Sequence, residues 1–115
     1  MTESFRIKKV NNLIWELMGQ IFQRECQFPA NSLVTILGVE TSKDLLYSKI
    51  TVSVFPAEKR EITLDYLNKN IYDLQQFLNK KLNMRPVPKI RFVLDATEEE
   101  AAKIEKLLEK LKEEK

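Results

Sequence analysis

Apolar residues recur along this chain with two different periods, and the order of those periods is the strongest constraint on its fold. A spacing of three or four residues is typical of one helix face, and strict alternation is typical of a half-buried strand. Three segments show each pattern: 10–22, 64–82 and 101–111 for helices, and 33–40, 45–55 and 89–94 for strands. The predicted fold class is α+β, in the order α-β-β-α-β-α, with helices packed on one face of a three-stranded sheet.

The first two strands are predicted to form a hairpin. Thr41-Ser42-Lys43-Asp44 is a polar turn, in which Asp44 is expected to stabilise the turn rather than to bind a ligand. Alternation in the second strand predicts an outer face with Lys49, Thr51 and Ser53. The expected inner face is Leu46, Ile50, Val52 and Val54.

The helical segments carry three further signals. Gly19 lies inside the first helix, where glycine costs about 1 kcal/mol relative to alanine, so we expect its small size to allow another element to pack closely. Asn68-Lys69-Asn70 forms helix poorly and predicts a kink or break in the second helix. Thr97 and Glu100 have the spacing of a capping box, which predicts the start of the last helix.

Composition excludes several classes of function. A chain of 115 residues is expected to form a single domain. It has no histidine, one cysteine (Cys26) and two glycines, so catalysis by histidine, a cysteine-rich zinc site and a glycine-rich phosphate loop are all excluded. We therefore expect neither an enzyme nor a cofactor. No second apolar face demands a dimer, and we expect a monomer.

The location of the protein is predicted from what the sequence lacks. No apolar run approaches the ~20 residues that span a bilayer, and the first residues do not have the pattern of a secretory signal. A lone cysteine suits a reducing compartment. We expect a cytoplasmic protein without membrane contact.

Positive charge is concentrated in one part of the chain. Residues 69–94 carry a net charge of +5, whereas residues 95–115 carry −3. A basic zone of this kind favours an anionic partner. Cations that only keep a helix end and a strand soluble are the alternative interpretation. The six basic residues are Lys69, Lys80, Lys81, Arg85, Lys89 and Arg91.

Aromatic side chains could stack on unpaired bases. Among six candidates, Phe77 and Phe92 are expected in the core, and Tyr72, beside the predicted helix break, is the best stacking candidate. Trp15 lies off the main helical stripe, and its place at the surface or at the edge of the core stays open. The remaining candidates are Tyr47, Phe55 and Tyr66.

Four signatures in this order resemble the bacterial ribosome-binding factor A family, whose fold is a type II KH domain followed by an extra helix. The first is a basic start of the first helix, at Arg6, Lys9 and Val10, and the second is the hairpin segment, at residues 39–45. The third is the alternating strand after it, at residues 45–55. The fourth, at residues 82–95, has a proline three residues after an arginine, then an apolar-x-Phe strand closed by aspartate.

The resemblance implies a fold, partners and a role. Residues 1–95 would form a KH-like RNA-binding domain, and residues 96–115 a helix that belongs to it or packs against it. The family binds the 30S ribosomal subunit, assists late maturation of 16S rRNA including its 5′ end, and supports cold adaptation. The chain departs from the family at the inter-helix turn, where Asn70-Ile71-Tyr72 stands in place of the small residues that allow the backbone to approach RNA closely.

These observations together predict the residues that contact rRNA. Basic side chains would neutralise phosphates, and Tyr72 would stack on a base at the helix break. Arg85 has a competing structural role, either capping the preceding helix or pairing with Asp95. A general binder of single-stranded RNA and a protein-interaction module remain alternatives. The predicted basic contacts are Lys80, Lys81, Arg85, Lys89, Arg91 and Lys69, extended by Arg6, Lys8 and Lys9.

Overall fold

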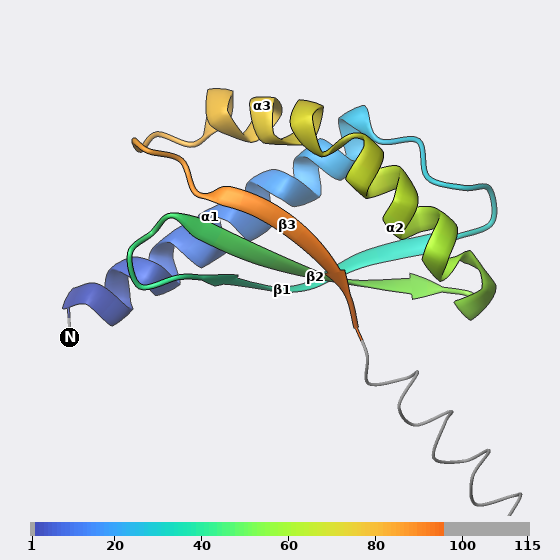
Figure 1. The fold of residues 1–115 in the computed structure, drawn as a ribbon, viewed down its shortest axis with the longest axis horizontal. Helices are drawn as coiled ribbons and strands as arrows, with labels where there is room; N and C mark the ends of the chain where they lie inside the picture. The colour runs from blue at the N-terminus through green and yellow to red at the C-terminus, as the bar shows by residue number, and fades with distance from the viewer. Residues whose placement is uncertain (1, 96–115) are drawn as a thin grey trace, which may run out of the picture.

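The computed structural model describes residues 2–95, with side chains from Phe5 onward. The described elements confirm the predicted α+β class and its order (Figure 1). The predicted last helix, and with it the proposed boundary at residues 95 and 96, lies outside the described residues. The elements are α1 (Thr2–Glu25), β1 (Leu33–Thr41), β2 (Tyr47–Phe55), the 3-10 turn η1 (Ala57–Lys59), α2 (Arg60–Lys69), α3 (Ile71–Lys81) and β3 (Lys89–Leu94).

The three strands form one sheet in the order β1-β2-β3, in which β1 and β2 are antiparallel and β2 and β3 are parallel. The described helices pack on one face of it, as predicted. Helix α1 contacts β1 and α3, α2 contacts β2 and β3, and α3 contacts β3. The other face of the sheet is free of described helices.

The core lies between the sheet and the helices. Ile50, Val52 and Val54 of β2 are fully buried, as the alternation predicted, and Phe92 of β3 is buried beside them. Leu46, which was predicted on the inner face, is instead 44% exposed. The reason is that β2 begins only at Tyr47, so Leu46 belongs to the turn and the strand alternation does not reach it.

The hairpin turn is organised by Asp44, as predicted. Its Oδ1 accepts hydrogen bonds from the Ser42 hydroxyl (2.5 Å) and from the Leu46 N–H (3.1 Å). Both bonds favour the ionised carboxylate and lower the pKa of Asp44 below its usual value, the Ser42 bond having the larger effect. Leu45 completes the turn in the left-handed region, with φ 65°.

A β-bulge in β1 changes which side chains face the core. Ile36 pairs with Val52, but Gly38 pairs with Thr51, so Leu37 is an extra residue in its strand. Ile36 and Val39 are therefore both buried although they are three residues apart, and Leu37 is 45% exposed. Simple alternation cannot place both residues inward.

The predicted break in the second helix is confirmed at Asn70. The Asn70 N–H and its side-chain Nδ2 both donate to the carbonyl oxygen of Tyr66, at 3.1 Å and 2.8 Å. With φ −103° and ψ 10°, Asn70 leaves helical geometry, and α3 starts at the next residue. A side chain that competes for backbone partners is the physical cause expected from asparagine.

The close packing that we expected at Gly19 is absent. A methyl group built at Gly19 would have no heavy atom within 4 Å outside its own neighbourhood in the helix. The glycine is thus not required by packing against another described element.

Candidate nucleic-acid interface

A basic-rimmed groove lies between the first half of α1 and the chain that leaves α3. Arg6, Lys9, Val10, Leu13 and Leu17 form one wall because their spacing places them on one helix face. The groove has a volume of about 390 Å³. The opposite wall consists of Lys81, Leu82, Asn83 and Met84.

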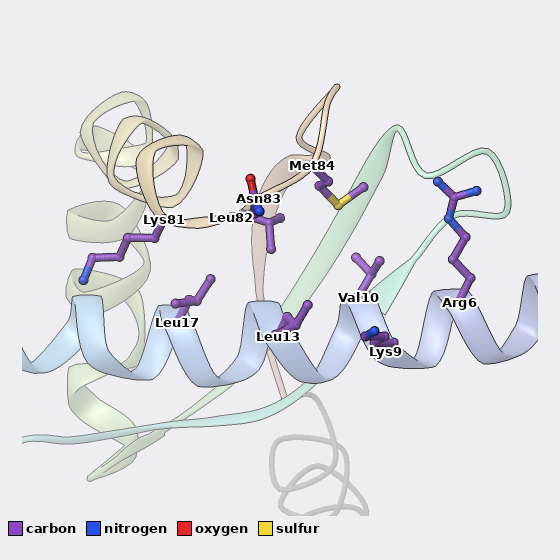
Figure 2. Close-up of a pocket in the computed structure, with 9 residues that line it drawn as sticks. All are labelled: Arg6, Lys9, Val10, Leu13, Leu17, Lys81, Leu82, Asn83 and Met84. Carbon is purple, nitrogen blue, oxygen red and sulfur yellow. The ribbon is translucent and has the colours of Figure 1, made fainter.

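The groove combines an apolar floor with cations at its two ends. The floor consists of the apolar side chains of the two walls, Val10, Leu13, Leu17, Leu82 and Met84. Figure 2 shows Arg6 at one end and Lys81 at the other, with Val10, Leu13 and Leu17 along the helix between them. Arg6, Lys9 and Lys81 are exposed, so their charges can reach a ligand in water. Such a surface can hold phosphates at its rim while it shelters an apolar or aromatic group.

The surface of α1 continues beside this groove. A second hollow of about 530 Å³ is lined by Phe5, Lys8, Asn12 and Glu16 together with Lys9 and Leu13. Phe5 is 72% exposed and Leu13 is 40% exposed. Lys8 thus extends the basic surface along the helix, and its contact with rRNA stays a prediction.

The structure brings together only some of the predicted contact residues. Arg6, Lys8, Lys9 and Lys81 lie on or beside the groove. Lys80 is exposed in the last turn of α3, where it also complements the helix dipole, but does not line the groove.

Lys69 and Tyr72 flank the helix break at Asn70, and both side chains are exposed, Tyr72 by 72%. Stacking of Tyr72 on a base stays a prediction. Ile71, between Asn70 and Tyr72, is half-buried and packs against the core.

Lys89 and Arg91 belong to a different surface. Both side chains are exposed in β3, on the face of the sheet opposite the helices, where alternation with buried Ile90 and Phe92 places them. The prediction grouped them with Lys80 and Lys81, but the sheet lies between the two sets.

Arg85 caps the chain that leaves α3. Its Nη1 donates to the carbonyl oxygens of Leu82 (3.2 Å), the residue that follows α3, and of Met84 (2.6 Å) in the loop. The backbone carbonyl of Asp95 accepts a hydrogen bond from Arg60 Nη2 (2.5 Å). Arg85 is exposed, and its contact with RNA stays a prediction.

Several other expectations can be compared with the described residues. Phe92 is buried and Phe77 is half-buried against the core, as predicted, and Trp15 is 46% exposed. No helix within residues 2–95 is long and apolar enough to cross a membrane. The same residues hold no cluster of three or more side chains of the types that bind metals.

Sequence reasoning missed the apolar floor and two residues of the sheet surface. Leu13 and Leu17 belong to the apolar stripe of residues 10–22, which was used only to predict a helix, although Arg6 and Lys9 at helical spacing beside them indicated a further use. Tyr47 was named among the aromatic residues that could stack but was not selected as a contact, and Lys49 was assigned only to the outer face of its strand. Only the strand register shows that they lie beside Lys89 and Arg91.

Comparison with known proteins identifies the family. The sequence pattern that defines "Ribosome-binding factor A" matches residues 6–108. The chain belongs to the ribosome-binding factor A family. A ribosome-binding factor A from Bdellovibrio bacteriovorus is 34% identical over 112 residues, which are 96% of this chain and 84% of that protein.

Solved structures of ribosome-binding factor A share this fold. The solution structure of a Thermotoga maritima protein described as a putative ribosome-binding factor A is similar, with a TM-score of 0.67 and 29% identity over 78% of this chain and 87% of that one. A homology model of the Thermus thermophilus ribosome-binding factor A, fitted into a cryo-EM map of a 30S complex, gives a TM-score of 0.64 at 22% identity. The match covers 75% of this chain and 91% of that one. The type II KH-like fold expected for the family is thus confirmed.

Proposed function

We propose that this chain binds the 30S ribosomal subunit and assists late maturation of 16S rRNA, including its 5′ end. Membership of the ribosome-binding factor A family carries the proposal. The groove between α1 and the end of α3 provides a physical means of binding, because three exposed cations surround an apolar floor. The role requires binding alone and no bond-making step.

In this mechanism the groove holds one unpaired nucleotide of rRNA. Arg6, Lys9 and Lys81 neutralise the phosphates on either side, and the nucleotide's base covers Leu13 and Met84 on the floor. Binding only the conformation in which that nucleotide is unpaired would shift the rRNA toward it by differential affinity. The factor would thereby hold an immature segment in place until later contacts replace it.

Co-sedimentation with purified 30S and 50S subunits tests the proposal. We expect the chain to pellet with 30S subunits and not with 50S subunits, and binding to weaken as salt rises because released counterions drive association. Equal binding to both subunits would identify a general RNA binder. Absence of 30S binding at low salt would refute the proposal.

The role in 5′ maturation needs a cellular readout. In cells depleted of this chain, primer extension should detect 16S rRNA with an unprocessed 5′ end. The wild-type chain should restore processing, and the Arg6→Gln/Lys81→Gln variant should not. Normal processing in depleted cells would leave the chain as a 30S binder without this role.

A further inference from the structure

The outer face of the sheet carries its own group of basic and aromatic side chains. Tyr47 (59% exposed), Lys49, Lys89 and Arg91 all point away from the helices. They surround the end of the sheet at which β3 begins. Arg91, Tyr47 and Lys49 line a hollow of about 250 Å³ there, together with Glu40, Thr41 and Ser42 at the end of β1. We call these four residues the outer-face cluster.

The strand register brings this cluster together. In the parallel ladder between β2 and β3, Tyr47 pairs with Lys89, and Lys49 pairs with Arg91. Paired residues on adjacent strands lie about 4.8 Å apart, and residues two apart on one strand lie about 6.6 Å apart. The tyrosine ring therefore has a cation beside it on the next strand and another cation two residues along its own strand.

These side chains are available to a ligand. Within residues 2–95, Lys89 and Arg91 form no ion pair, and the Tyr47 ring packs against no other aromatic ring. Lys49 Nζ lies 3.5 Å from Glu40 Oε2 at the surface, with the Lys49 side chain 36% exposed and the Glu40 side chain 78% exposed. Such exposed pairs contribute little stability, so a phosphate can displace the carboxylate.

We propose that the outer-face cluster is a second RNA-binding surface, in which Tyr47 stacks on an unpaired base and Lys49, Lys89 and Arg91 hold the adjoining phosphates. An exposed aromatic ring among cations fits single-stranded RNA because the ring stacks on any base while the cations neutralise the backbone. An acidic protein segment would use the cations but would have no comparable use for the ring. The inference rests on the proposed function only for the source of this RNA, the ribosomal small subunit.

The position of this surface suits a factor that holds two rRNA segments. The first half of α1, the β1–β2 turn and the loop before β3 lie at the same end of the molecule (Figure 1). The groove residues Asn83 and Met84 belong to that loop, and Lys89 follows them at the start of β3. The groove and the outer-face cluster therefore lie on opposite sides of the sheet at one end of the molecule. The protein could hold one rRNA segment on each side there.

Affinity for a short fluorescent oligouridylate and co-sedimentation with 30S subunits test this inference. Tyr47→Ala should weaken oligouridylate binding roughly five- to 150-fold, the loss typical of a stacked aromatic residue, and Tyr47→Phe should restore it. Lys89→Gln/Arg91→Gln should lower the salt dependence by about 1.4 log units per log unit of salt, for two phosphate contacts. The same variants should weaken 30S binding.

Matched controls separate this inference from the proposed function. Phe55→Ala removes an aromatic side chain that is 67% exposed in the same strand, and Arg24→Gln/Lys59→Gln removes two cations elsewhere. Neither control should change binding, and all variants should keep the wild-type circular dichroism spectrum and melting temperature. If only Arg6→Gln/Lys81→Gln weakens 30S binding, the proposed function stands and the second surface is refuted.

Two other outcomes also decide the question. If the outer-face variants lose 30S binding but bind oligouridylate as the wild type does, the surface contacts something other than single-stranded RNA and the inference is wrong. If the wild type does not bind 30S subunits, the proposed function fails. In that case the oligouridylate titration still decides whether the cluster binds RNA.

Discussion

Removing the two cations at the ends of the groove should reduce the salt dependence of 30S binding by a calculable amount. Arg6 and Lys81 lie at opposite ends of the groove, and both are exposed. Each contact with a single-stranded phosphate contributes about 0.7 log units of affinity per log unit of salt. The Arg6→Gln/Lys81→Gln variant should therefore show a slope that is smaller by about 1.4.

This slope corresponds to a measurable change in binding. Over a fourfold rise in salt, the wild type should lose roughly sevenfold more affinity than the variant, from two phosphate contacts alone. Co-sedimentation with 30S subunits at a series of potassium chloride concentrations measures both slopes. Because each substitution is at the surface, the melting temperature of the variant should stay close to that of the wild type.

The Arg24→Gln/Lys59→Gln variant is the control for total charge. Arg24 lies in the last turn of α1, about 27 Å along the helix from Arg6, and Lys59 lies in η1. This control should keep the wild-type slope. Equal slopes for the groove variant and the wild type would refute phosphate binding at the groove, and equal reductions in both variants would show a diffuse charge effect instead.

Three further predictions concern stability and the reactivity of the cysteine. Gly19→Ala should raise the free energy of unfolding by about 0.5–1 kcal/mol, because the added methyl group meets no neighbour within 4 Å. Chemical denaturation measures this free energy, and a lower value for the variant than for the wild type would contradict the prediction. Thr63→Val should stabilise by about 1 kcal/mol in the same assay, because the Thr63 hydroxyl is buried without a hydrogen-bond partner among residues 2–95. Burial, and secondarily the Glu25 charge, raise the pKa of Cys26 to about 11, so its alkylation rate should still be rising at pH 9–10; a plateau by pH 9 would disprove this.

Much of the fold could be predicted because its elements are specified locally. The bounds of β3 follow from alternation between two prolines and an aspartate, and the break at Asn70 follows from the tendency of asparagine to bind backbone groups. Leu46 was misplaced because alternation alone does not say where a strand begins. The bulge at Leu37 could not be predicted, since it exists only in the pairing with β2.

The candidate interface was predicted less completely than the fold. The sequence determined that the chain is α+β, that it resembles ribosome-binding factor A, and that cations are concentrated in residues 69–94. Only the tertiary structure decided which of these cations act together. Lys81 and Lys89, which are close in sequence, are separated by the sheet, whereas Arg6 and Lys81, which are far apart in sequence, line the two ends of one groove. The physical reason is that charge is counted along the chain, but strand pairing and helix packing determine which charges share a surface.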